Sequence, residues 1–378
     1  MYAVVLAATH DRGLSGDGRE VARPLLDLGD EPLLLALVRR VARVSGLEKI
    51  VIVTNDAIKS ELDQWAADEL SVSPVPVEII SDGTSSREDA KGALGDLIFA
   101  IRQSRIQTDL LVIGGDNWFS YDIEEFVEQA RQKSPAVVVT PFRAGWRSSR
   151  FGVAETDETG RIVSFLEKPP SSSLKLKASC VYYFSAMDLK WLDVFADEQS
   201  TVCSPGTFFA WLVDRTAVYG VTMTATWYDV GKRPGQALEG PDFLELRKVL
   251  RRLVSPVYST WEREAGQQIQ WATTWENLLE FLDDPDPNRR IVAAQVLGHI
   301  KHLLAQEARS RVVEELLRLL GDEAVNQITY GGFQGDEDSV CRVSSVAAEA
   351  LVHLGYAATV DGVFEKAHVR GAKVVEPK

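Results

Sequence analysis

The chain has 378 residues, 45% of them hydrophobic, with a formal net charge of -14 and a pI of about 5.0. This length allows two domains with ordinary hydrophobic cores. The acidic balance argues against nucleic acid or an anionic membrane as the main partner, and three scattered cysteines favour reduced thiols in the cytoplasm.

The first 240 residues alternate between strand and helix patterns. Tyr2–Ala8 is a short apolar run typical of a buried parallel strand, without the basic flank or cleavage pattern of a signal peptide. Pro32–Val44 carries apolar residues at helical spacing, with a proline suited to a first turn. Further strands are predicted at Lys49–Asn55, Val77–Ser81 and Leu110–Gly114, and a further helix at Asp96–Gln103. No apolar stretch approaches the ~18 residues of a membrane span.

Repeated strand–helix–strand units predict a mixed, mainly parallel sheet with helices on both faces, a Rossmann-like three-layer α/β domain. In such domains ligands bind at the carboxyl ends of the strands. Thr9, Ser81 and Asp116 all fall at predicted strand ends. We therefore expect a single ligand-binding cleft that includes these three positions.

Four motifs follow one another along residues 2 to about 238. The loop after the first strand reads Leu6-Ala7-Ala8-Thr9-His10-Asp11-Arg12-Gly13-Leu14 and precedes Ala22-Arg23-Pro24-Leu25-Leu26. The fourth strand ends in Gly114-Gly115-Asp116-Asn117. A hairpin begins with Phe151-Gly152-Val153 and ends with Glu167-Lys168-Pro169, and the last motif reads Trp227-Tyr228-Asp229-Val230-Gly231.

In this order the motifs resemble those of the sugar-phosphate nucleotidylyltransferases, the pyrophosphorylases that make nucleotide sugars. The resemblance implies a GT-A-type domain over residues 1–240. It also implies a reaction in which a sugar 1-phosphate, or a cyclitol phosphate, attacks the α-phosphorus of a nucleoside triphosphate and pyrophosphate leaves. The segment from Asp82 to Asp96 resembles a bacterial subgroup of the same family.

The resemblance also assigns roles to individual residues. Asp116 and Asp229 are expected to hold Mg²⁺, which takes one or two carboxylates together with phosphate oxygens. The alternative for each is an ordinary helix N-cap or turn aspartate. Arg12, Arg23 and Asp116 are the expected catalytic residues. The expected nucleotide-binding residues are Leu6, Ala7, Ala8, Thr9, Asp82 and Gly92.

The sugar end of the expected site uses three residues of the hairpin. Lys168 would hold the sugar phosphate as a point charge, and Glu167 would accept hydrogen bonds from ring hydroxyls. Gly152 would let the backbone approach the sugar, as Gly92 would let it approach the base. The alternatives are a solvated hairpin end for the charged pair and ordinary turn glycines for the other two.

The first loop departs from the family pattern at four positions. Thr9 and Asp11 stand where the family has glycines, Gly13 stands where it has arginine, and Arg23 replaces its lysine. A carboxylate at Asp11 would repel phosphates unless it faces away from them.

Two hypotheses follow from this altered loop. In the first, Arg12 and Arg23, together with His10, rebuild the pyrophosphate site. In the second, triphosphate binding has been lost, and the chain is a nucleotide-sugar-binding regulatory or scaffolding subunit. The retained Asp116, Asp229 and Lys168 favour the first.

Residues 241–378 are expected to form a second, all-helical domain. Helices are predicted at Glu276–Leu282 and Asn288–Lys301. Val292–Ile300 is echoed 54 residues later by Val346–Leu354, with an insertion at Thr329–Ser339. The repeat resembles HEAT-type repeats of paired helices, whose usual period is shorter, and the insertion accounts for the excess. The resemblance predicts contact with the catalytic domain, with a second copy in a homodimer or with a protein partner. Matching positions of His299 and His353 favour a structural role over metal binding.

Overall fold

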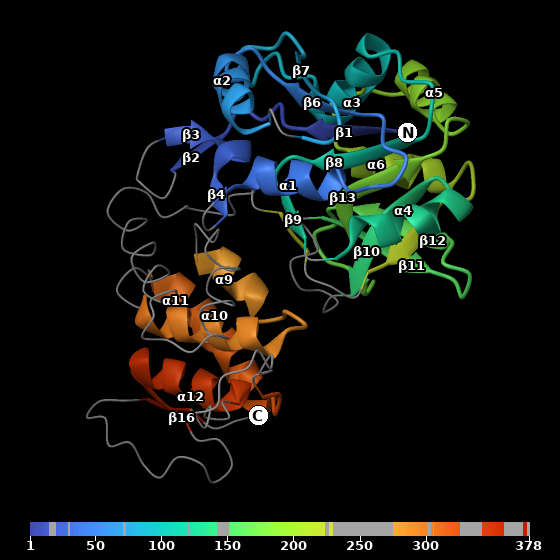
Figure 1. Cartoon of the computed structure of the whole chain (residues 1–378). Coiled ribbons are helices and arrows are strands. Elements are labelled where there is room, and N and C mark those ends of the chain that lie inside the picture. Colours follow the sequence, from blue (N-terminus) through green and yellow to red (C-terminus); the bar gives the residue numbers. More distant parts are fainter. Residues whose placement is uncertain are drawn as a thin grey trace, which may run out of the picture. The chain divides into compact units, whose positions relative to one another are not determined.

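The structure is a computed structural model that describes residues 1–14, 20–28, 31–70, 73–119, 121–141, 151–223, 227–229, 275–300, 304, 306–325, 342–358 and 373–375 (Figure 1). The chain divides into two compact units, Met1–Gly231 and Lys232–Lys378. The boundary predicted after residue 240 and the insertion Thr329–Ser339 both lie outside the described residues.

The first unit is built on a nine-stranded mixed sheet with the main order β12-β11-β13-β8-β1-β6-β7, with β10 beside β13 and β14 beside β10. β1 (Tyr2–Leu6) lies between β6 (Lys49–Thr54) and β8 (Leu110–Gly114) and is parallel to both. β7 (Val77–Ser81) extends this parallel block. The remaining strands are β10 (Ala136–Pro141), β11 (Gly152–Thr156), β12 (Ile162–Glu167), β13 (Leu176–Phe184) and β14 (Tyr219–Thr222).

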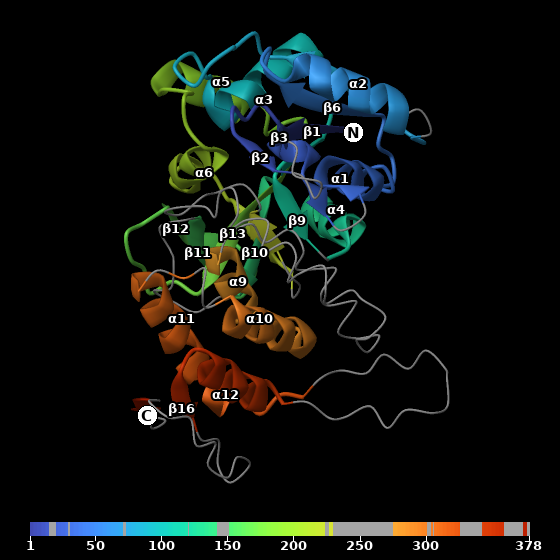
Figure 2. The same ribbon diagram turned by 90° about the vertical axis from the view of Figure 1, so that its left-hand side faces the viewer.

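Helices cover both faces of the sheet because successive strand side chains point to opposite sides. Ala3 and Val5 of β1 pack in one core with α1 (Leu33–Val41), α2 (Lys59–Glu69) and α4 (Ile123–Gln132). Val4 packs in the other core with α3 (Gly92–Gln103), α5 (Lys190–Glu198) and α6 (Pro205–Val213). Figure 2 separates the two layers, with β1 between them. The predicted three-layer α/β architecture is confirmed for this unit.

Most predicted elements agree with the structure to within three residues at each end. The strands predicted at Val77–Ser81 and Leu110–Gly114 have those bounds. The main difference is α3, which begins at Gly92 and not at Asp96. Its first turn, Gly92-Ala93-Leu94-Gly95, contains two glycines and therefore carries little apolar periodicity.

Several short elements lie outside the main sheet. They are β2 (Arg12–Leu14), β3 (Glu20–Ala22), η1 (Arg23–Leu25), β4 (Asp27–Leu28), β5 (Glu31–Pro32), β9 (Asn117–Phe119) and β15 (Trp227–Asp229). β2 and β3 form a hairpin directly after the β1 loop. β9 and β15 form a separate antiparallel pair, which brings the end of the first unit back beside β8.

The described part of the second unit is mainly helical. Its elements are α9 (Trp275–Phe281), α10 (Pro287–His299), α11 (Gln306–Arg318), η4 (Leu319–Gly321), α12 (Val343–His353), β16 (Tyr356–Ala358) and β17 (Lys373–Val375). A β-carbon added at Gly298 would lie 2.9 Å from the Ala350 Cα, so α10 and α12 approach closely. The rings of His299 and His353 meet edge to face with centroids 4.9 Å apart. The two halves of the sequence repeat therefore pack on each other.

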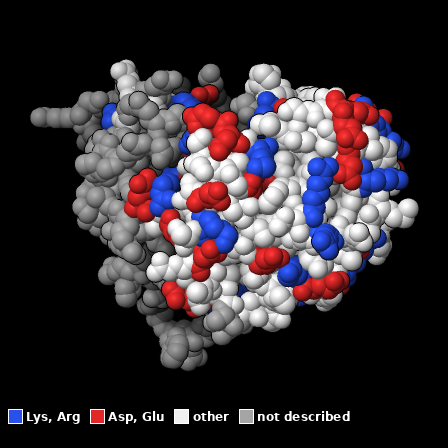
Figure 3. Space-filling view, turned by 90° about the horizontal axis from the view of Figure 1, so that it is seen from above, with Lys and Arg blue, Asp and Glu red and all other residues white. Residues whose placement is uncertain are grey.

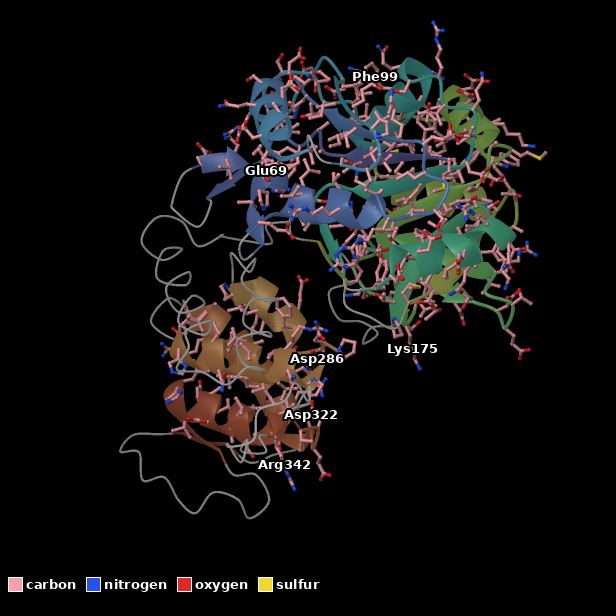
Figure 4. All side chains as sticks on the ribbon, viewed as in Figure 1. Glu69, Phe99, Lys175, Asp286, Asp322 and Arg342 are labelled. Atoms are coloured by element: carbon pink, nitrogen blue, oxygen red, sulfur yellow. The ribbon has the colours of Figure 1, made fainter. Side chains whose placement is uncertain are left out.

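The N-terminal ends of α10 and α12 lie on the same side of this unit, where Figure 4 labels Asp286, Asp322 and Arg342. Asp286 caps α10 by accepting a hydrogen bond from the Asn288 N–H at 2.9 Å. Asp322 accepts a hydrogen bond from Arg290 Nε at 2.9 Å. None of the helices in the described parts of the chain is long and apolar enough to cross a membrane.

Candidate functional site

The loop after β1 lies at a reversal of strand order. From β1 the chain moves outward through β6 and β7, and then returns to the other side of β1 with β8. The Gly115 N–H donates a hydrogen bond to the Leu6 carbonyl at 2.8 Å, and the Ala7 N–H donates one to the Val53 carbonyl at 2.8 Å. These bonds hold the base of the loop against the ends of β8 and β6. Such reversal points are where open α/β sheets bind ligands.

Gly115 is required for this close approach. A β-carbon at that position would lie 2.9 Å from the Leu6 carbonyl oxygen and 3.0 Å from the Ala7 Cβ. Any larger residue would push the loop away from the strand end. The predicted nucleotide-binding loop and the predicted Asp116 are therefore neighbours in space.

Asp116 and Asp229 are brought to adjacent strands. Asp116 is half-buried directly after β8, and its Oδ1 accepts a hydrogen bond from Asn117 Nδ2 at 2.9 Å. Asn117 begins β9, and the register of β9 with β15 sets Asp229 opposite it. Only the backbone of Asp229 is described. Paired residues on antiparallel strands have Cα atoms about 4.5–5.5 Å apart, so the backbone of Asp229 lies beside that of Asn117, the residue next to Asp116.

This donor set is compatible with Mg²⁺. The described residues contain no group of three or more His, Cys, Asp or Glu side chains arranged to hold a metal ion. Mg²⁺ does not need such a group, because it commonly takes one or two protein carboxylates and completes its shell with phosphate oxygens and water. The pair Asp116 and Asp229 has that chemistry.

The two predicted arginines of the first loop point to different partners. Arg23 Nη2 donates to Asp11 Oδ2, and Arg23 is only 7% exposed. Arg12 Nη2 instead lies 2.8 Å from Glu61 Oε2 on α2. Glu61 also accepts the Ala22 N–H at 2.9 Å, so it ties the hairpin β2–β3 to α2. The sequence patterns did not single out Glu61.

Two further polar residues, which the motifs did not identify, support the loop. Asn55, at the end of β6, donates from Nδ2 to the Thr9 carbonyl at 3.0 Å. Thr84 Oγ1 lies 3.4 Å from His10 Nε2. Asn55 directly follows a parallel strand, and Thr84 lies in the segment from Asp82 to Asp96 that resembles a bacterial subgroup, and these are the signals that could have indicated them.

Asp82 and Asp96 form a buried carboxyl pair beside the loop. They are 4% and 6% exposed, respectively. Asp82 accepts hydrogen bonds from the Thr84 N–H and hydroxyl, both at 2.8 Å. Burial, followed by the hydrogen bond and the charge of Asp82, raises the pKa of Asp96 to about 8. Asp96 is therefore protonated at neutral pH and donates to Asp82, a residue predicted to contact the nucleotide.

We expect Asp96→Asn to flatten the pH dependence of stability. Because the folded-state pKa lies above the ordinary value of 3.8, unfolding releases a proton between about pH 4 and pH 8. The free energy of unfolding should therefore fall as pH rises through that range, by at most about 1.4 kcal/mol per pH unit, and level off above it. Asn keeps a donor toward Asp82 without a titrating group. Urea unfolding from pH 5 to 9 measures the slope of the unfolding free energy against pH for wild type and for Asp96→Asn. Equal slopes in the two proteins would reject the raised pKa of Asp96.

The sugar end of the predicted site is held by the start of α6. Ser204, the N-cap of α6, donates from Oγ to Glu167 Oε1 at 2.6 Å. Lys168 Nζ lies 3.2 Å from the same oxygen. Lys168 has a φ of 47°, an uncommon conformation for a residue with a side chain that occurs often at functional sites. Ser204 has no motif around it that the sequence patterns could have used.

The glycines of this region make room for protein groups. A β-carbon at Gly206 would lie 2.0 Å from Glu167 Oε2, and one at Gly152 would lie 2.6 Å from Cζ of Phe165. Gly92 has a φ of 72°, and a β-carbon there would lie 2.8 Å from the Cys203 backbone nitrogen. The predicted approach of the sugar at Gly152 and of the base at Gly92 stays a prediction.

The segment from Thr201 to Gly206 joins the two halves of the candidate site. The Leu94 N–H, in the first turn of α3, donates to the Cys203 carbonyl at 3.1 Å. Ser204 next to it binds Glu167. The nucleotide residues and the sugar residues predicted from separate motifs therefore share one supporting segment. On the face that Figure 3 displays, acidic and basic side chains are interspersed.

Parts of the chain are similar to known proteins. The sequence matches the family described as nucleotidyl transferase over residues 3–235. Two glucose-1-phosphate adenylyltransferases of Desulfitobacterium hafniense, from strains Y51 and DCB-2, are 37% identical over 76 residues and 36% identical over 77 residues. These matches span 20% of this chain and 19% of each relative, so only about a fifth of their length is shared.

One solved structure shows the fold of the first unit. It is a crystal structure, in complex with sucrose, of a protein from Bacillus anthracis assigned as a glucose-1-phosphate thymidylyltransferase. It superimposes with a TM-score of 0.51 at 18% identity, covering 61% of this chain and 90% of that chain. This degree of similarity establishes a shared architecture.

Proposed function

The chain belongs to the nucleotidyl transferase family, and from this premise we propose that it condenses a nucleoside triphosphate with a sugar 1-phosphate, or a cyclitol 1-phosphate, to give a nucleotide sugar and pyrophosphate. One observation carries the proposal. The hydrogen bond from Gly115 to Leu6 sets Asp116 beside the loop after β1. Phosphoryl-type transfer needs little covalent chemistry from the protein and depends on positioning and charge neutralisation.

Each end of the proposed site has its own task. The loop from Leu6 to Thr9, with Asp82 and Gly92, would hold the nucleotide, and Arg23 would face its terminal phosphates. Lys168 and Glu167 would hold the sugar phosphate and the ring hydroxyls. The shared segment around Ser204 would keep the attacking oxygen in line with the α-phosphorus.

Asp116 and Asp229 are the residues that would hold Mg²⁺, which when bound would neutralise charge on the reacting phosphates. Asn117 supports this role by donating to Asp116 Oδ1. That bond orients the carboxylate at the end of β8.

Pyrophosphate release tests the proposal directly. The full chain is incubated with Mg²⁺, each of four nucleoside triphosphates and a panel of hexose, pentose and cyclitol 1-phosphates. Release with one pair, together with the matching nucleotide sugar by mass spectrometry, is the expected result. Binding of nucleotide sugar without turnover would support the regulatory-subunit alternative instead.

We expect Arg23→Ala to weaken triphosphate binding more than Arg12→Ala does. A charge-assisted contact to phosphate contributes about 1.5–3 kcal/mol, which corresponds to about ten- to a hundredfold in affinity. Arg23 is buried beside the loop, whereas Arg12 would first have to leave Glu61. Calorimetric titration of triphosphate into wild type, both alanine variants and Arg23→Lys ranks their affinities for triphosphate. Equal affinities in all four proteins would reject a rebuilt pyrophosphate site.

For the second unit, the packing of α10 on α12 supports HEAT-like pairing of the repeated segments. We propose that this unit contacts a second copy or a protein partner, and that the protein works in the cytoplasm. Light scattering of the full chain, compared with a chain ending at residue 231, tests the contact with a second copy.

A further inference from the structure

One carboxylate of the chain lies in the loop where the proposed function requires phosphate groups. Asp11 follows β1 and stands at a position where the resembling family has glycine. Its Oδ2 accepts a hydrogen bond from Arg23 Nη2, and its Oδ1 pairs with Arg87 Nη2. These three side chains, Asp11, Arg23 and Arg87, form what is called here the Asp11 cluster.

The cluster contains two positive charges and one negative charge. Arg23 is buried, and a buried guanidinium is costly unless an anion compensates it. Arg87 differs, since its side chain is 71% exposed and an exposed ion pair contributes little to stability. Arg87 can therefore exchange its partner at small cost.

The segment that carries Arg87 has a defined shape. It is the β7–α3 loop, residues 82–91. Asp89 accepts hydrogen bonds from the Ser85 N–H at 3.0 Å and the Ser86 N–H at 2.8 Å, which closes a turn around Arg87. The Asp56 N–H donates to the Thr84 carbonyl at 2.8 Å and ties the same loop to the end of β6. Arg87 therefore contacts Asp11 from the β7–α3 loop, and the hydrogen bonds of Asp89 and Asp56 hold that loop in place.

We propose that Asp11 occupies the position of a phosphate group, and that the pyrophosphate part of the triphosphate displaces it and takes over both Arg23 and Arg87. This inference rests on the proposed function and adds two residues to it. Arg87 becomes a phosphate-binding residue. Asp11 competes with pyrophosphate for the two arginines and so lowers the affinity of the site for pyrophosphate. Carboxylate and phosphate both present paired oxygens to a guanidinium fork, so one can replace the other.

Titration with inorganic pyrophosphate tests the exchange without turnover. A competing group lowers the apparent affinity to the fraction of time for which the site is open, so removing the group raises the affinity by the reciprocal of that fraction. Asp11→Asn and Asp11→Gly should therefore bind pyrophosphate about tenfold more tightly than wild type. Arg87→Ala should bind it about tenfold more weakly. The matched controls are Asp63→Asn and Arg102→Ala, which remove exposed members of the ion pairs Lys59–Asp63 and Arg102–Asp193.

Thermal unfolding gives an independent measure. Asp11→Asn leaves Arg23 with less compensation, so the melting temperature without ligand should fall. Pyrophosphate at a fixed concentration should then raise the melting temperature more than in wild type, because stabilisation by a ligand increases with the logarithm of its affinity for the folded state. An unchanged affinity and an unchanged ligand-induced shift in both Asp11 variants would overturn the proposal. If neither Asp11 variant folds, Arg87→Ala is the deciding variant. A pyrophosphate affinity equal to that of Arg102→Ala would then reject the proposal.

The result of this binding test can be distinguished from the result of the turnover test of the proposed function. A chain that binds pyrophosphate through the cluster but releases none from any substrate pair retains this inference and loses the reaction. A chain that turns over normally but in which the Asp11 and Arg87 variants match their controls retains the reaction and loses this inference.

Discussion

Replacing Asp116 by Ala or Asn should lower turnover by about a thousandfold or more, with little change in the fold. Asp116 is half-buried at a strand end and is not part of either hydrophobic core. Its loss removes a negative charge from the point where phosphates and Mg²⁺ would meet. Pyrophosphate release and Mg²⁺-dependent nucleotide binding are measured on the same protein, with circular dichroism as the check on folding.

Asp63→Asn serves as the control for Asp116→Asn, because both remove one carboxylate charge and Asp63 lies on the exposed side of α2. The control should keep full activity. Near-normal activity of Asp116→Asn would contradict the assignment. Loss of the native circular dichroism spectrum would mean that Asp116 is a structural residue.

Replacing Lys168 by Ala should raise the KM for sugar phosphate about ten- to a hundredfold and leave the KM for triphosphate within about twofold of wild type. Only the sugar phosphate would lose its charge-assisted contact. Lys168 already lies 3.2 Å from Glu167 and is held in a left-handed backbone conformation. Initial rates with each substrate varied in turn measure the two constants.

Lys49→Ala is the matched control, since Lys49 begins β6 at the amino edge of the sheet and pairs with Glu78. It removes the same charge from the edge opposite the strand ends that carry the candidate site. An equal rise of both KM values in Lys168→Ala would contradict the role at the sugar end. A rise of the same size in the control would show that net charge alone is responsible.

The parallel part of the fold could be predicted from local patterns. β1, β6 and β8 are short runs of mainly apolar residues, because a strand buried on both faces has little room for polar side chains. Their order along the chain, alternating with helices, allows few sheet topologies. Residues directly after these strands, such as Thr9 and Asp116, could therefore be assigned to one edge before any coordinates were known.

The partners of those residues could not be predicted in the same way. Ser204 donates a hydrogen bond to Glu167, and Arg87 forms an ion pair with Asp11. In each pair the two residues are distant in the sequence, and no hydrophobic periodicity predicts that they are neighbours. Hydrogen bonds and ion pairs depend on separations of a few ångströms. Only the packing of α3 and α6 on the sheet, and the closure of the β7–α3 loop, sets such separations.

By itself, the sequence determined which side chains stand at strand ends, because a strand places its residues with a period of two and ends where its apolar run ends. The tertiary structure alone decided the charge environment of those side chains. Arg12 faces Glu61 while Arg23 faces Asp11, and Asp96 shares a buried site with Asp82. Electrostatic interactions act through space and depend strongly on burial, so neighbours along the chain, such as Asp11 and Arg12, can have entirely different partners.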